Sequence, residues 1–183
     1  GLEEEKNGID KIATYYAERA KGGVGLIVTG GIAPNIQGWT GPFSARMSTK
    51  KHAKEHQKIT KAVHEAGGKI CMQILHAGRY GYHPFNVAPS KIKAPINPFK
   101  PFKLNKFGVK RTIKDFVNCA KLSKMAGYDG IEIMGSEGYL INQFIVEHTN
   151  RRKDKWGGSY QNRMRLPITL SLIHISEPTR RVR

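Results

Sequence analysis

Three polar or glycine-rich segments each follow a short apolar run, and they hold the residue types that could do chemistry. The third segment, residues 134–144, brings a tyrosine hydroxyl, a glutamate and two glycines directly after the run 128–133. In the second, Gln73 lies just inside the end of its run, and its amide offers both a donor and an acceptor. That pair of groups suits the imide edge of a flat heterocycle, although the same amide can equally be a satisfied core group. The first segment holds Gly30 and Gly31, which would let a flat ligand approach the backbone, but taken alone the pair is better explained as a turn.

The same unit of helix, glycine stop and apolar strand occurs three times. Apolar spacing predicts helices over 9–21, 49–65 and 112–125, and strands over 24–28, 69–75 and 128–133. Alternating helices and apolar strands favour a parallel sheet with right-handed crossovers, in an open doubly wound sheet or a closed barrel. In barrels the catalytic groups lie at the carboxyl ends of the strands, which is where the three segments fall.

The chain is strongly basic, with a formal net charge of +17, and the lysines concentrate in 46–61 and 91–115. A solvated lysine-rich surface is the favoured interpretation, and a phosphorylated small molecule is the alternative. We expect no nucleic-acid partner because no nucleic-acid fold signature is present. No apolar run approaches the roughly 20 residues that span a bilayer, so we expect no membrane partner and a cytoplasmic protein.

The cysteines and the one suggestive histidine pair do not indicate a metal site. Cys71 and Cys119 have no metal-ligand spacing, and both are expected to be small buried hydrophobes. His52 and His56 are four residues apart, which is ligand spacing on a helix, but no third ligand is near. We expect this pair to lie on a solvated helix face and predict no metal.

Five segments carry a resemblance to a known family. They are GGVGLIVTGGIAPN, QILHAGRY, SKIKAPIN, AGYDGIEIMGSEGYLINQF and TNRRKDKWGGSYQNRMR. Together they resemble the old yellow enzyme family of flavin-dependent barrels, and within it most of all the bacterial-type NADPH-dependent 2,4-dienoyl-CoA reductases. The resemblance runs from Gly1 to about Pro167 and implies a (β/α)₈ barrel. A full barrel needs about 250 residues, so the expected fold class is α/β, a partial (β/α)₈ TIM barrel with about three βα units.

The resemblance also implies site residues and cofactors. Gly31 matches a backbone position against FMN, Gln73 matches the glutamine that binds the flavin pyrimidine, and Tyr139 matches the active-site tyrosine. His76 and Arg79 match family positions without an assigned role. NADPH is the implied electron source, and FAD and a 4Fe-4S cluster are expected only in a downstream part.

The implied reaction is FMN-dependent reduction of a conjugated carbon–carbon double bond in an unsaturated acyl-CoA thioester. A hydride would come from the flavin and a proton from Tyr139, since a phenol stays protonated at neutral pH. The alternative is a single-domain enoate or quinone reductase of the same family. Where the resemblance implies a substrate arginine nine residues past the tyrosine, the chain has His148. The run 150–158 is predicted to be a structural clamp in which Asp154 accepts from an arginine.

The two ends of the chain lead to a domain prediction. We expect residues 1–168 to be a fragment of an FMN-binding TIM-barrel domain that is inactive alone. Residues 169–183 are expected to be non-native, because LSLIHISEPTR resembles the translation of a transposon-type sequencing adapter.

Overall fold

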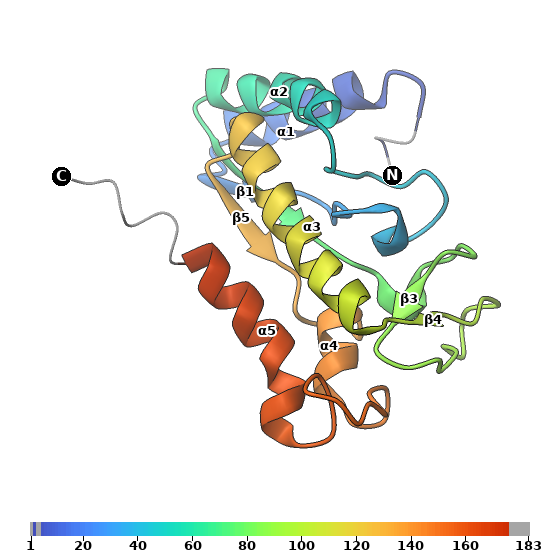
Figure 1. The fold of residues 1–183 in the computed structure, drawn as a ribbon. Coiled ribbons are helices and arrows are strands. Elements are labelled where there is room, and N and C mark those ends of the chain that lie inside the picture. Colours follow the sequence, from blue (N-terminus) through green and yellow to red (C-terminus); the bar gives the residue numbers. More distant parts are fainter. Residues whose placement is uncertain (1, 3–4, 176–183) are drawn as a thin grey trace.

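The computed structural model describes residue 2 and residues 5–175. Residues 176–183 of the predicted non-native segment therefore lie outside the described residues, whereas 169–175 form the end of a helix. Figure 1 shows the arrangement of the elements. In chain order they are α1 (Gly8–Lys21), β1 (Leu26–Val28), α2 (Lys50–Glu65), β2 (Lys69–Ile74), β3 (Val87–Ala88), β4 (Phe102–Lys103), α3 (Lys106–Met125), β5 (Gly130–Ile133), α4 (Leu140–Ile145) and α5 (Tyr160–Ile175).

The main sheet consists of the three predicted strands, in the order β1-β2-β5 and parallel throughout. Parallel neighbours joined through helices α2 and α3 form successive βα units. The register places Val28 opposite Cys71 and Gln73 opposite Glu132, so the carboxyl ends of the strands meet at one edge. One bridge, between Ile32 and Ile74, extends the pairing past the end of β1.

The two faces of the sheet differ sharply in burial. Strand alternation directs Ile70, Met72 and Ile74 to the face that packs against the helices, and all three are fully buried. On the opposite face Leu26 is 54% exposed and Val28 41% exposed. In a closed barrel that second face is the interior.

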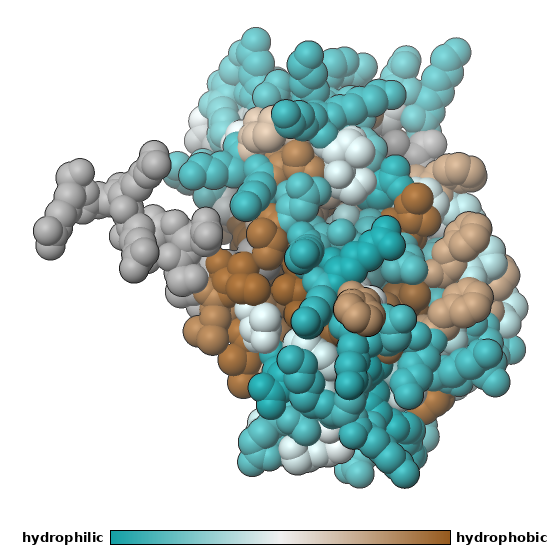
Figure 2. Space-filling view, in the orientation of Figure 1, coloured by the Kyte–Doolittle hydropathy of each residue, from teal (hydrophilic) through white to brown (hydrophobic). Residues whose placement is uncertain are grey.

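An apolar cleft of about 400 Å³ lies between β5 and α5. Ile131 and Ile133 line it from the strand, and Pro167 and Leu170 line it from the helix. Figure 2 shows apolar side chains gathered on this side of the molecule. Helix α5 therefore covers one side of β5 only in part.

Helix α3 begins six residues earlier than predicted. Asn105 is extended, and its side chain accepts from the Gly108 backbone N–H at 2.7 Å, which caps the first turn. The buried residues Val109 and Thr112 then extend the apolar face toward Phe116. The sequence predicts a start at 112 because Gly108 and the surrounding lysines interrupt the apolar spacing of the first turns.

The long connection between β2 and α3 is ordered rather than loose. It contains β3 and β4, which form a short parallel pair. The side-chain amides of Asn86 and Asn97 both donate to the carbonyl oxygens of Arg79 and Gly81. These bonds hold the connection against the end of β2.

The expectation of a solvated face for His52 and His56 is wrong for His56. Its ring is 7% exposed, and its Nδ1 lies 2.9 Å from the Tyr128 hydroxyl. Helical spacing places it on the buried face of α2 beside Ile59. Burial lowers the pKa of His56 to about 4. His52 is half-buried, and its Nδ1 accepts from the Ser48 backbone N–H at 3.2 Å.

The burial prediction holds for Cys119 and fails for Cys71. Cys119 is fully buried, whereas Cys71 is half-buried because strand alternation places it on the open face of the sheet. Among the described residues, no three His, Cys, Asp or Glu side chains are grouped so as to hold a metal ion. No helix in the described part of the chain is long and apolar enough to cross a membrane.

Candidate functional site

Gln73 lies near the carboxyl end of the central strand, on the open face of the sheet. Its Nε2 donates to a carboxylate oxygen of Glu132, directly opposite on β5, at 2.8 Å. Its backbone N–H donates to the Thr29 hydroxyl at 3.0 Å, which ties it to the end of β1. Over the described residues, the side-chain Oε1 carries no hydrogen bond. The amide is thus oriented by Glu132 and presents an open acceptor.

Gly31 lies beside Gln73, because the N–H of the next residue, Ile32, donates to the Gln73 carbonyl oxygen at 2.9 Å. A Cβ on Gly31 would sit 2.5 Å from Leu75 Cδ1, so packing against Leu75 requires a glycine here. A Cβ on Gly30 would meet nothing within 4 Å. The turn therefore leaves its Gly30 side open next to the Gln73 amide.

Tyr139 precedes α4 and is positioned by a strained loop. Glu137 and Gly138 both have left-handed backbones, with φ of 59° and 76°. The Tyr139 ring packs edge-on against Tyr80, with the ring centroids 6.2 Å apart and the planes at 83°. A Cβ on Gly138 would sit 2.7 Å from Tyr80 Cε2. Tyr80 thus fixes both the loop and the ring of Tyr139, whose hydroxyl makes no hydrogen bond within the described part of the chain.

Gln143 supports this site, and sequence reasoning missed it. The side chain is 2% exposed, and its Nε2 donates to the carbonyl oxygens of Ala77 (3.2 Å) and Gly138 (2.7 Å). Its Oε1 accepts from the Arg79 backbone N–H at 3.0 Å. One amide therefore joins the loop after β2 to the loop that carries Tyr139. The available signal was a glutamine within an apolar stretch, four residues after the tyrosine.

His76 and Arg79 have supporting roles in the loop after β2. The His76 ring is buried and stacks on Phe116, with the centroids 6.4 Å apart, and burial lowers its pKa to about 3. A neutral His76 accepts the Gly78 N–H on Nδ1 at 3.1 Å. The Arg79 guanidinium lies over the Tyr80 ring at 5.5 Å. His148, in contrast, is exposed at the surface.

The predicted clamp is present. Arg152 is 3% exposed and forms a bidentate pair with Asp154, at 2.9 and 2.6 Å. The same guanidinium donates to the carbonyl oxygens of Pro89 and Leu104 in the long connection. The Asn150 amide donates to the carbonyl oxygens of Phe144 and Trp156. The Arg152 bonds fasten the chain after α4 to the connection between β2 and α3, and the Asn150 bonds hold the clamp itself together.

The donor set at the strand ends fits a flavin ring. An imide N–H needs an acceptor, and the open Oε1 of Gln73 is one. The open side of Gly30 gives room for a flat ring beside it. Tyr139 lies in the loop that follows the neighbouring strand β5, directly before α4.

Comparison with known proteins identifies the family. A family profile described as the NADH:flavin oxidoreductase / NADH oxidase family matches residues 1–172. The chain is 39% identical over 168 residues to an NADH oxidase from Thermoanaerobacter brockii, covering 87% of this chain and 26% of that protein. It is 36% identical over 166 residues to an NADPH dehydrogenase from Listeria monocytogenes, covering 89% of this chain and 49% of that protein.

The solved structures agree with this result. Morphinone reductase superposes with a TM-score of 0.83 at 28% identity, over 88% of this chain and 48% of that chain. An old yellow enzyme homologue from Zymomonas mobilis gives 0.81 at 31% identity, over 90% and 49%. The fold class prediction is therefore confirmed: the chain is an α/β partial TIM barrel. It spans between a quarter and a half of the length of these relatives. The chain belongs to the NADH:flavin oxidoreductase family, the old yellow enzyme family.

Proposed function

We propose that the protein containing this chain reduces a conjugated carbon–carbon double bond in an unsaturated acyl-CoA thioester, with FMN as cofactor and NADPH as electron source. The observation that carries the proposal is that three groups lie at or just past the carboxyl ends of adjacent parallel strands, at one edge of the sheet. These are the Gly30–Gly31 turn, the oriented amide of Gln73 and the hydroxyl of Tyr139. This edge is where barrels carry their chemistry.

The residues divide into those that hold the ring and one that moves a proton. Gln73 and the Gly30–Gly31 turn would hold the flavin, which supplies the hydride when bound. Tyr139 donates a proton to the carbon next to the carbonyl as negative charge develops there. Its hydroxyl makes no hydrogen bond to any described residue, and its ring packs edge-on against Tyr80.

In the dienoyl-CoA reductase form of the proposal, FAD and a 4Fe-4S cluster in further domains would relay electrons from NADPH. The similarity to a much longer relative, the Thermoanaerobacter brockii protein, of which this chain covers 26%, supports this form. The described residues contribute the barrel part of the site.

The test is Tyr139→Phe in the full-length enzyme. We expect FMN to stay bound and NADPH to reduce it at the normal rate, whereas reduction of a dienoyl-CoA should slow by about 10²–10⁴-fold, the range for a lost general acid. Tyr160→Phe, an exposed tyrosine at the start of α5, is the matched control and should leave both rates unchanged. Unchanged dienoyl-CoA turnover in Tyr139→Phe would remove this residue from the mechanism.

A second candidate is a simpler enoate or quinone reductase of the same family. Two observations favour it: the chain covers 49% of a Listeria monocytogenes NADPH dehydrogenase, and the exposed His148 replaces the arginine implied for the thioester. The ratio of kcat/KM for an unsaturated acyl-CoA to that for a simple cyclic enone distinguishes the two. A ratio below one assigns the protein to the second class.

A further inference from the structure

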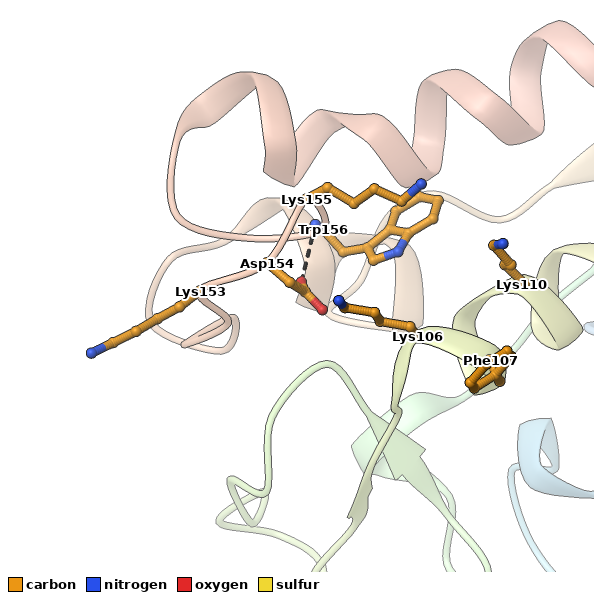
Figure 3. A pocket seen from close by; sticks show the side chains of 7 residues that line it. All are labelled: Lys106, Phe107, Lys110, Lys153, Asp154, Lys155 and Trp156. Carbon is orange, nitrogen blue, oxygen red and sulfur yellow. Dashed lines mark hydrogen bonds between the residues drawn. The ribbon is translucent and has the colours of Figure 1, made fainter.

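A basic cleft opens at the same end of the molecule as the strand ends, between the first turn of α3 and residues 153–156 (Figure 3). Its volume is about 510 Å³, within the range of small-molecule sites. Four lysines and two aromatic residues line it: Lys106, Lys110, Lys153, Lys155, Phe107 and Trp156. Neither the flavin site nor the clamp accounts for this grouping.

The positive charge of the cleft is not neutralised from within. Its one acidic residue, Asp154, gives both carboxylate oxygens to Arg152, and one of them also accepts the Trp156 backbone N–H at 3.1 Å. The hydrogen bond from Arg152 lowers the pKa of Asp154 below its ordinary value. The first turn of α3 has no acidic residue, so the positive end of that 20-residue helix adds to the lysines. The cleft is therefore an environment for an anion.

Trp156 provides a second and independent sign of a ligand. The side chain is 4% exposed, and its Nε1 is buried without a hydrogen-bond partner among the described residues. In Figure 3 the indole nitrogen faces the gap toward α3, between Lys106 and Lys110, whereas Lys153 points away. A buried N–H without an acceptor is costly, and an anionic oxygen in the cleft would pair it.

Phe107 indicates that the anionic ligand also carries an aromatic group. Its ring is 81% exposed on the first turn of α3, at the mouth of the cleft. An exposed aromatic ring beside lysines is an arrangement on which a nucleobase stacks while its phosphates meet the ammonium groups.

We propose that this cleft binds a phosphorylated nucleoside, with its phosphate between Lys106, Lys110 and the Trp156 N–H and its base against Phe107. The chemistry is shared by two sources, the 3′-phosphorylated nucleoside of coenzyme A and the 2′-phosphorylated nucleoside of NADPH. Assigning the ligand to either source rests on the proposed function, whereas the binding itself does not.

The experiment is titration calorimetry on the full-length enzyme saturated with FMN, using adenosine 3′,5′-bisphosphate and adenosine 2′,5′-bisphosphate as probes. We expect Lys106→Gln combined with Lys110→Gln to weaken binding of the preferred probe about tenfold, as expected for two partly screened charge contacts. The matched control is Lys121→Gln with Lys124→Gln, which removes the same charge from exposed positions at the far end of α3. Trp156→Phe, which keeps an aromatic ring but removes the indole N–H, should also weaken binding.

The outcomes separate the two proposals. Tighter binding of the 3′,5′ probe indicates the thioester as the source, and tighter binding of the 2′,5′ probe indicates NADPH. The proposal that this cleft binds a phosphorylated nucleoside would be overturned by either of two results. One is an equal loss of probe affinity in the Lys121→Gln, Lys124→Gln control, and the other is equal affinity for unphosphorylated adenosine. If the probes bind as expected but no thioester is reduced, the proposed reaction is refuted and the binding proposal for the cleft is retained. If thioester reduction is normal and the probes bind no more weakly to the Lys106→Gln, Lys110→Gln variant, the binding proposal for the cleft is refuted and the proposed reaction is retained.

Discussion

Replacing Gln143 by methionine tests whether one buried amide holds the Tyr139 loop in place. Methionine has nearly the same length and volume, so the change removes hydrogen bonds without opening a cavity. It leaves the Gly138 carbonyl oxygen and the Arg79 N–H without their partner, whereas the Ala77 carbonyl oxygen keeps its bond from the Tyr80 N–H at 3.2 Å. A buried group left unpaired costs about 1–3 kcal/mol. Gly138 and Arg79 are half-buried and can regain part of their hydration, so we expect a total loss of about 2 kcal/mol.

The assay is urea unfolding of the full-length enzyme, together with turnover of the unsaturated substrate. Gln57→Met is the control, because Gln57 is exposed and its Nε2 makes one surface bond, to the Met125 carbonyl at 3.1 Å. That variant should stay within about 0.5 kcal/mol of wild type. Turnover should fall in Gln143→Met alone, since Gly138 carries the backbone into Tyr139. If the two variants have equal unfolding free energies, Gln143 does not hold the loop.

Two further predictions follow from burial and from backbone strain. His56 and His76 have pKa values lowered by burial to about 4 and about 3, so the unfolded chain binds protons on them first as the pH falls. Their contribution to stability is complete above about pH 6.5 and declines below it, by about 2 kcal/mol per histidine at pH 5. His56→Gln should therefore lose less unfolding free energy than wild type between pH 7 and pH 5, and identical losses would contradict the argument. Gly138→Ala should lower turnover and destabilise the protein by about 1–2 kcal/mol, because a Cβ there meets Tyr80 and the backbone φ is +76°; wild-type turnover would show that Tyr80 can move aside without cost.

The strands were predictable because their signal is local. A buried parallel strand is a short apolar run in the sequence. Each of the three strands begins and ends within two residues of the predicted bounds. Gln73 and Tyr139 could be singled out for the same reason, since each lies at or just past the end of such a run. The start of α3 was not visible, because its first turn is lysine-rich and exposed and depends on the cap by Asn105.

The burial of His56 could not be read from its neighbours in the chain. Spacing alone gives the same pattern for a solvated pair and for a buried one. The difference lies in the Tyr128 hydroxyl, 72 residues away, which pairs with the ring nitrogen. Gly31 is a similar case: a glycine is required there by Leu75, a contact between the segments that follow β1 and β2, rather than by the turn itself.

The reactive groups can therefore be predicted from the local sequence, whereas the residues that support them depend on contacts between distant parts of the chain. Gln73 lies just inside the end of one apolar run, and Tyr139 lies in the polar, glycine-rich segment after another, so the local sequence marks both without knowledge of the fold. Gln143 and Tyr80 act only because β2 and β5 are adjacent, which places the loop of one strand against the loop of the other. A substitution that keeps the local pattern can thus preserve every reactive group and still lose their alignment. For this reason the supporting amide, rather than the tyrosine alone, is the sharper test of how the strand ends form one site.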